Sequence, residues 1–133
     1  MTSIAPRVTR QVYSDHKAWV YADISLQPGR ASVTLDLSKF VKGTHYPKGF
    51  VPSGIPLGKI TATGLYGPYD NSASDGREVC AGFLWAHTDD VVDANGKTTA
   101  ALWFGPGAIQ ENELPVTIDA NGKTDLASWF KFF

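Results

Sequence analysis

The middle of the chain alternates apolar and polar positions in two arms around a polar centre. Leu57, Lys59 and Thr61 alternate with small or apolar neighbours, a period of two that predicts a β-strand. Residues 64–70 are rich in glycine and proline and are predicted to break this strand and open a wide turn. In the second arm, residues 79–86, both alternating sets are apolar or small. We therefore expect a strand that is central to the core.

Upstream, residues 19–24 and 32–37 also predict strands. The second of these has a clean alternation, which is typical of a half-buried antiparallel strand. A Pro28-Gly29 turn between them predicts a hairpin. Residues 42–54 are predicted to be a loop because glycine and proline are frequent there. Residues 35–41 fit a helix and a strand equally well.

Downstream, one hexapeptide occurs twice. Asp-Ala-Asn-Gly-Lys-Thr fills residues 93–98 and again residues 119–124. Asn-Gly between apolar runs is the strongest short signal for a β-hairpin. The hairpin pairings that it predicts are 91–92 with 99–104 and 116–118 with 126–130.

Composition supports a small, mostly β domain. A chain of 133 residues is one domain by length, and its 13 glycines, eight prolines and 16 aromatic residues favour many short strands. With 12 basic and 13 acidic residues the net charge is −1, which argues against a nucleic-acid partner. The sequence shows neither a long apolar run nor a signal-peptide pattern, so we expect no membrane partner and synthesis in the cytoplasm. The single cysteine, Cys80, lies in an apolar segment and is predicted to be a small buried hydrophobe.

Residues for catalysis are sparse. The histidines are far apart, and neither a His-Glu-x-x-His nor a Cys-x-x-Cys motif occurs. His87 with Asp89 and Asp90 is the best cluster, as a metal or catalytic site or as a solvated strand edge. The repeated Asp-x-Asn-Gly lacks the third ligand and the final Glu of a calcium loop. We therefore expect no catalytic residue, metal or cofactor, and a protein that is not an enzyme.

Both ends of the chain allow two interpretations. Residues 1–18 form a distinct segment in which apolar residues share parity around Pro6, and residues 19–133 form the domain. The segment is either a disordered terminus or an arm that adds a strand to a partner's sheet edge. Four of the last five residues, 129–133, are aromatic, and they either complete the core or contact another subunit.

The middle segment resembles a known family. Leu-Gly-Lys-Ile-Thr (57–61), Gly-Leu-Tyr-Gly-Pro-Tyr-Asp (64–70) and Ala-Ser-Asp-Gly-Arg-Glu (73–78) precede a small apolar strand. In order and spacing they resemble the head decoration proteins of tailed phages, of the lambda protein D type. The resemblance covers residues 44–92.

The resemblance implies a β-clip, barrel-like domain with short hairpins and an extended N-terminal arm. It also implies a capsid cement protein on the outside of the expanded head. As a homotrimer at local three-fold axes, the protein would bind the major capsid protein and stabilise the shell against DNA pressure. The arm residues expected to bind the capsid are Ile4, Val8, Arg10, Val12 and Tyr13. The residues expected at the trimer contact are Tyr66, Tyr69, Phe132 and Phe133.

Two other functions remain open. A carbohydrate- or receptor-binding module of the virion surface would use Trp85, Trp103 and Trp129, if these rings are exposed, to stack on sugars. A small hydrolase would use His87 with the neighbouring aspartates.

Overall fold

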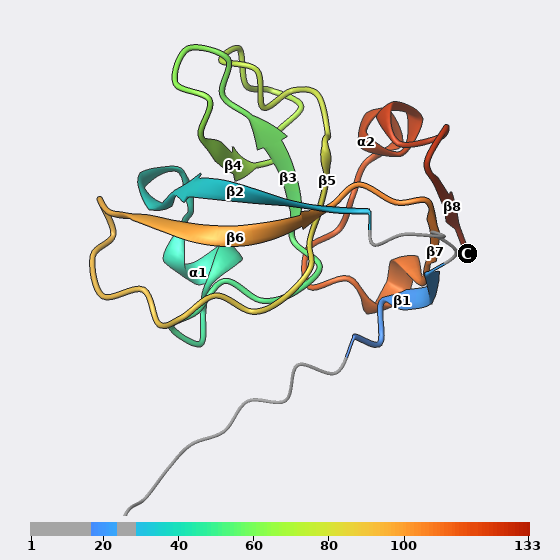
Figure 1. Cartoon of the computed structure of the whole chain (residues 1–133), viewed down its shortest axis with the longest axis horizontal. Coiled ribbons are helices and arrows are strands. Elements are labelled where there is room, and N and C mark those ends of the chain that lie inside the picture. Colours follow the sequence, from blue (N-terminus) through green and yellow to red (C-terminus); the bar gives the residue numbers. More distant parts are fainter. Residues whose placement is uncertain (1–16, 24–28) are drawn as a thin grey trace, which may run out of the picture.

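Eight short strands form two sheets in residues 17–23 and 29–133, the part of the chain that this computed structural model describes. Strands β2, β4, β3, β5 and β6 close a barrel in this order, and β1, β7 and β8 form a three-stranded sheet beside it (Figure 1). The predicted mostly β, barrel-like class is therefore confirmed. The strands are β1 (Val20–Asp23), β2 (Arg30–Asp36), β3 (Pro56–Lys59), β4 (Tyr66–Pro68), β5 (Gly82–Leu84), β6 (Lys97–Trp103), β7 (Gly107–Ile109) and β8 (Phe130–Phe132). The helical turns are η1 (Leu37–Lys39), α1 (Lys42–His45), η2 (Glu111–Glu113) and α2 (Ala120–Asp125).

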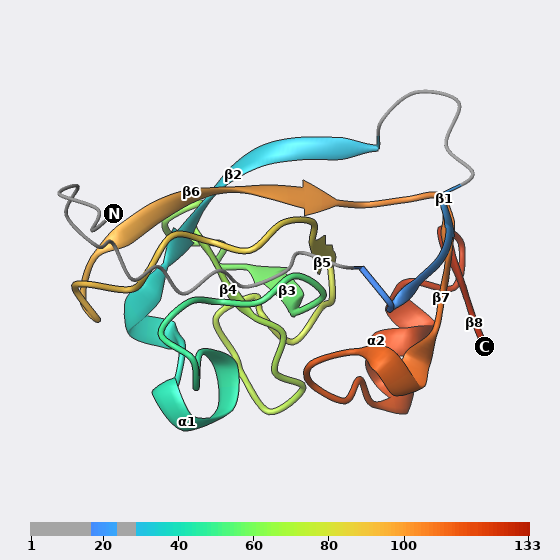
Figure 2. The same cartoon turned by 90° about the horizontal axis from the view of Figure 1, so that it is seen from below.

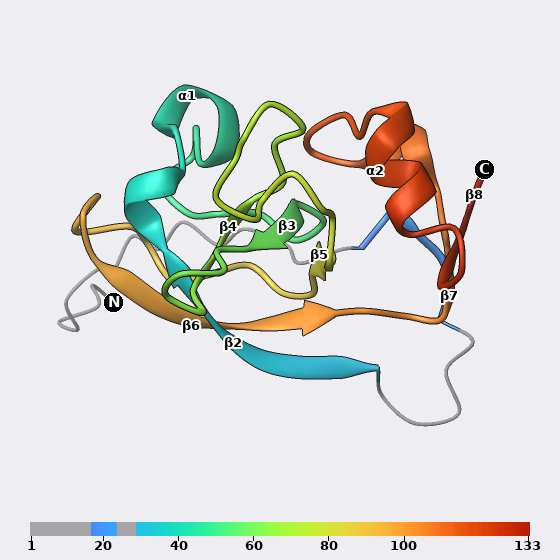
Figure 3. The same cartoon turned by 90° about the horizontal axis from the view of Figure 1, so that it is seen from above.

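The long β2–β6 ribbon forms one side of the molecule. The two strands pair antiparallel from Arg30 opposite Trp103 to Asp36 opposite Lys97. Figures 2 and 3 show α1 and α2 on the side opposite to this ribbon. The predicted hairpin between residues 19–24 and 32–37 is wrong, because β1 pairs with β7 while β2 pairs with β6 and β4. The local pattern identified both strands but carried no information about partners distant in sequence.

The wall formed by β5 and β6 is covered on both faces. Leu84 and Leu102 are paired and face the cluster inside the barrel. Phe83 and Trp103, the adjacent pair, face a second cluster between the barrel and the three-stranded sheet. All three residues of β5 are buried, which confirms that this segment is central to the core. The strand is shorter than predicted, and Val79 before it is exposed.

The turn predicted after the first arm contains a strand instead. β3 ends at Lys59, and residues 66–68 return as β4, antiparallel to β3 and parallel to β2. The glycines in this segment predicted the end of a strand, but here they allow the backbone of neighbouring segments to pack closely. Gly67 stands opposite Gly58, and a Cβ on Gly67 would lie 2.8 Å from the Arg77 Cδ atom.

Both hairpins predicted from the repeated hexapeptide are wrong. In the first copy, the Asp93 carboxylate accepts from the Asn95 amide, and β6 then pairs with β2 and β5. The second copy forms α2, and the Asp119 carboxylate caps it by accepting from the Gly122 amide at 2.8 Å. The residues that follow decide between the two. After the first copy, Thr99 favours a strand, whereas buried Leu126 after the second copy anchors the helical turn.

The predicted loop at residues 42–54 begins with the short helix α1. The His45 Nδ1 atom accepts from the Val41 amide at 2.8 Å, which satisfies one N–H at the start of this turn. Just before it, the ambiguous residues 35–41 divide into the end of β2 and the 3₁₀ turn η1. The rest of the segment carries core residues, including Phe50 and Val51.

Candidate functional site

The loop that follows β4 folds around Arg77. The Arg77 Nε atom donates to both Asp75 carboxylate oxygens, at 3.2 and 3.0 Å, and Nη1 donates to the Pro68 carbonyl at 3.4 Å. The Asp75 carboxylate therefore binds Arg77 within a turn of three residues. Gly76 adopts a φ of +116°, and its amide donates to the Glu78 carboxylate at 2.8 Å.

The paired glycines of β3 and β4 provide the space for this loop. A Cβ on Gly58 would lie 2.7 Å from the Arg77 Cα atom, and one on Gly67 would meet the Arg77 side chain. The loop therefore crosses the strand pair in close contact with its backbone. Gly58 and Gly67 lack a Cβ atom, and this leaves the space in which the loop with Arg77 packs against the two strands.

Tyr69 links this loop to α2. Its hydroxyl donates to the Asp119 carboxylate at 2.7 Å, and the same carboxylate caps the helix. Burial raises the pKa of Tyr69, and the hydrogen bond to Asp119 adds to this effect. The Gly122 amide, followed by the Tyr69 hydroxyl, lowers the pKa of Asp119. A second link runs from the Cys80 amide to the Asp125 carboxylate at 3.0 Å.

We predict that Tyr69→Phe reduces the acid sensitivity of the fold. The folded-state pKa of Asp119 is lowered, so its stabilising effect is present at neutral pH and lost as the pH falls below the ordinary value of 3.8. Removing the hydroxyl moves this pKa back toward that value. The variant should lose about 1 kcal/mol at pH 7 and less at pH 2–3. Urea unfolding at both pH values measures the difference, and an equal loss at both would contradict the assignment.

An exposed aromatic surface covers the outer side of the three-stranded sheet. Tyr21, Trp129 and Phe133 each expose more than half of their surface, and Phe104 exposes 39%. The Tyr21 and Phe133 rings stack with centroids 4.8 Å apart, and the Phe104 and Trp129 rings meet edge to face at 6.5 Å. We call these four residues the aromatic face. Exposed apolar side chains that gather on a surface are typical of interaction sites.

The structure separates the residues that were predicted for the trimer contact. Tyr66 packs against the cluster inside the barrel, while Tyr69 and Phe132 pack against the second cluster. Phe133 belongs to the aromatic face. The buried side chain of Phe130 completes the protein's own core, which is the first of the two interpretations, whereas Trp129 and Phe133 remain exposed. The predicted arm residues, Ile4, Val8, Arg10, Val12 and Tyr13, lie outside the described residues.

Tyr21 and Phe104 were not predicted as members of this surface. The alternation of residues 19–24 places Tyr21 opposite its two neighbours, which was the available signal. Phe104 lies one residue beyond β6, where strand periodicity no longer indicates a direction. Their proximity to the C-terminal aromatics depends on pairings of β7 with β1 and β8 that no local pattern reveals.

The groups considered for chemistry have structural roles. The His87 Nδ1 atom accepts from the Ser53 amide at 2.8 Å, and its ring packs 4.7 Å from that of Phe50. Cys80 is buried as predicted, and burial raises the pKa of its thiol to about 12. Within residues 17–23 and 29–133, no three acidic, histidine or cysteine side chains gather in a way that could hold a metal ion. No helix in this part of the chain is long and apolar enough to cross a bilayer.

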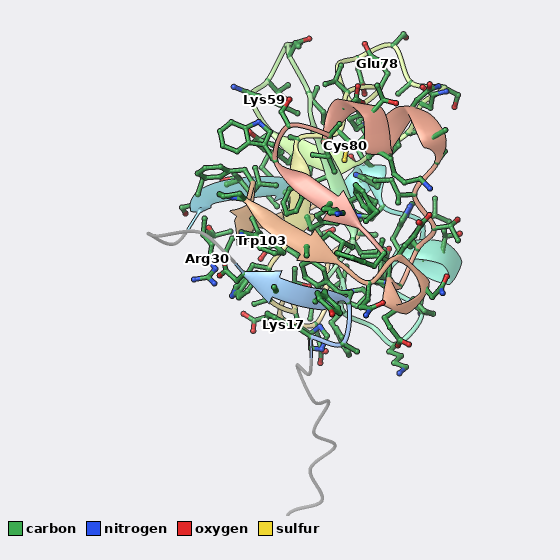
Figure 4. The ribbon with its side chains drawn as sticks, turned by 90° about the vertical axis from the view of Figure 1, so that its right-hand side faces the viewer. Lys17, Arg30, Lys59, Glu78, Cys80 and Trp103 are labelled. Atoms are coloured by element: carbon green, nitrogen blue, oxygen red, sulfur yellow. The ribbon has the colours of Figure 1, made fainter. Side chains whose placement is uncertain are left out.

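The three tryptophans proposed for sugar stacking have different environments. Trp103 is fully buried and contacts Trp19, Trp85 and Phe130 at centroid distances of 5.0–5.6 Å, so it does not meet the condition of an exposed ring. The Arg30 guanidinium lies 3.7 Å from the centroid of the half-buried Trp85 ring. Trp129 exposes its ring. Figure 4 shows Trp103 inside the molecule, with Arg30 and Lys17 near it.

Neither a protein-family model nor a curated protein sequence matches this chain at a significant level.

Proposed function

We propose that the protein is a capsid decoration protein of a tailed phage and that it binds the outside of the expanded head. The observation that carries this proposal is the course of residues 44–92. The motifs that resemble lambda-type decoration proteins form β3, β4 and the Arg77 loop, and they lead into β5. The resemblance therefore concerns the part of the chain that closes the barrel.

The proposed mechanism is binding, without a chemical step. Internal DNA pressure strains the contacts between capsomers, and a trimer at a local three-fold axis bridges several coat subunits. A ligand that binds only the assembled shell stabilises it by mass action. Three arms act together, so modest contacts from each arm give tight binding. In each arm, Ile4, Val8 and Val12 share the parity that pairing with a sheet edge requires.

The aromatic face supports a contact between subunits. Aromatic residues are typical anchors of protein interfaces, and here they come from both ends of the domain. The face includes Phe133, one of the residues expected at the trimer contact. Tyr21 stacks on Phe133, and the exposed pair of Phe104 and Trp129 adds a second aromatic contact surface.

We predict that the purified protein scatters light as a trimer of the 14.4 kDa chain and that Phe133→Ser weakens it. Loss of one buried aromatic side chain costs about 1.5–3 kcal/mol, which raises the dissociation constant by roughly tenfold or more. Val92→Ser is the matched control, because Val92 is 95% exposed and lies outside the aromatic face. A monomer at every concentration would exclude a trimer that forms before capsid binding.

A further inference from the structure

A groove opens on the outer face of the β2–β6 ribbon, next to the segment that follows β5. Its volume is about 420 Å³, within the range of small-molecule sites. Its lining includes Arg30, Ser32, His87, Thr99 and Ala101. We propose that this groove binds an acidic sugar, with the carboxylate of a hexuronate on Arg30. The proposal goes beyond capsid decoration and does not depend on it.

Arg30 is positioned before any ligand arrives. Its Nη2 atom donates to the Asp23 carboxylate at 2.8 Å, and its guanidinium lies on the Trp85 ring at 3.7 Å. Its Nε atom is buried and has no hydrogen-bond partner, so one N–H group of the guanidinium lacks an acceptor. A planar guanidinium whose rotamer is already set loses little conformational entropy when it binds a carboxylate, which it matches in geometry.

The charge around the groove favours an anion. Lys17 approaches the same Trp85 ring, with Nζ 5.0 Å from the centroid, so two cationic side chains flank one ring. Asp23 pairs with Arg30 but does not line the groove, and none of the described residues that line the groove is acidic. The ion pair of Arg30 and Asp23 is partly exposed to water, which weakens it, so an incoming carboxylate can compete for the guanidinium.

The remaining lining suits a hydroxylated ring. Ala31, Ala86, Ala100 and Ala101 leave space, because they place no large side chain in the groove. Ser32 and Thr99 come from the paired strands β2 and β6 and offer hydroxyls that both donate and accept. The Thr88 hydroxyl is already used, since it accepts from the Val51 amide and donates to the Asp89 carbonyl. A carboxylate on a ring with several hydroxyls, as in a hexuronate, satisfies both kinds of group.

The test is calorimetric titration of the full chain at low salt, where the screening length is about 30 Å. Galacturonate should bind with a millimolar dissociation constant, and neutral galactose at least tenfold more weakly. The hexuronate could be a single sugar or part of a polysaccharide, and titration with trigalacturonate distinguishes these two sources. If trigalacturonate binds with the same affinity as galacturonate, the groove binds a single sugar or a chain end. If trigalacturonate binds more tightly, the groove binds an internal unit of a polysaccharide.

Two variants and one control locate the site. Arg30→Lys keeps the charge but removes the planar fork, and it should weaken galacturonate binding at least tenfold. Ser32→Val removes a hydroxyl at an exposed strand position and should weaken galacturonate binding several-fold. This variant tests the site even if the Arg30 variant fails to fold. Lys59→Gln removes an exposed cation remote from Arg30 in Figure 4 and should leave the affinity unchanged.

No binding of galacturonate to the native chain would overturn the proposal. Inorganic phosphate binding as tightly as galacturonate would also overturn it, because the groove would then recognise only negative charge. Unchanged affinity in both folded variants would have the same consequence.

Discussion

Removal of residues 1–14 is expected to abolish binding to expanded phage heads while the domain stays folded and trimeric. The first buried anchor of the domain is Trp19, which is 2% exposed and donates from Nε1 to the Ser53 hydroxyl at 3.1 Å. Truncation before this residue leaves the anchor and both clusters intact. Three arms bind together, so their joint loss should reduce the affinity by about 10²-fold or more. Co-sedimentation with heads that lack the protein measures this loss.

The control for this prediction uses the parity of the arm. Strand pairing at a sheet edge places alternate side chains against the partner. Replacing Ile4, Val8 and Val12 by serine should therefore weaken binding strongly. Replacing Arg7, Thr9 and Gln11 by serine changes the opposite set and should have a small effect. Equal losses from both triple variants would argue against edge pairing, and unchanged affinity of the truncated chain would exclude the arm as the capsid ligand.

Trp103→Ala is expected to be the most destabilising single substitution in the second cluster. The side chain is fully buried in the wall that separates the two clusters, and it contacts the rings of Trp19, Trp85 and Phe130. Truncating a buried aromatic residue costs about 3–5 kcal/mol, because the cavity collapses only in part. Urea unfolding followed by far-ultraviolet circular dichroism measures the change.

Val79→Ala is the matched control for the core prediction. The sequence pattern placed Val79 on a buried strand, but the structure exposes it. Its truncation should therefore change the unfolding free energy by no more than about 0.5 kcal/mol. A loss at Val79 comparable to that at Trp103 would contradict the positions assigned to these two residues.

Some elements could be predicted because their signal is local. β2 has alternating positions, and β5 is apolar on both faces, so the local pattern suffices for each. The pairing between strands could not be predicted in the same way. β2 meets β6 some 70 residues later in the sequence, where Ser32 stands opposite Ala101, and no local pattern indicates this partner.

The repeated hexapeptide shows the limit most clearly. Residues 93–98 and 119–124 are identical, yet the first copy is a turn that enters β6 and the second forms most of α2. In the second copy, the Asp119 carboxylate accepts a hydrogen bond from the hydroxyl of Tyr69, which lies 50 residues earlier in the chain. The hexapeptide is compatible with both states, and tertiary contacts together with the following residues select one. Asn-Gly was therefore a weaker hairpin signal here than its general frequency suggests.

The candidate sites also divide into features that depend on local sequence and features that depend on strand pairing. The burial of Cys80 could be predicted from local sequence, and the Asp75–Arg77 ion pair is likewise a contact between near neighbours in the chain. The aromatic face required β7 to bring β1 and β8 together, and the groove beside Arg30 required the β2–β6 pairing. Surfaces assembled from distant strands become visible only when the pairings are known.

The most direct test of capsid decoration is electron microscopy of expanded heads saturated with the full-length protein or with the chain that lacks residues 1–14. The account predicts added density at the local three-fold axes with the full-length protein, including a connection from each domain to a coat-subunit sheet edge, and bare axes with the truncated chain. Heads that look the same with and without the full-length protein, or density in which residues 1–14 contact only their own barrel, would contradict it.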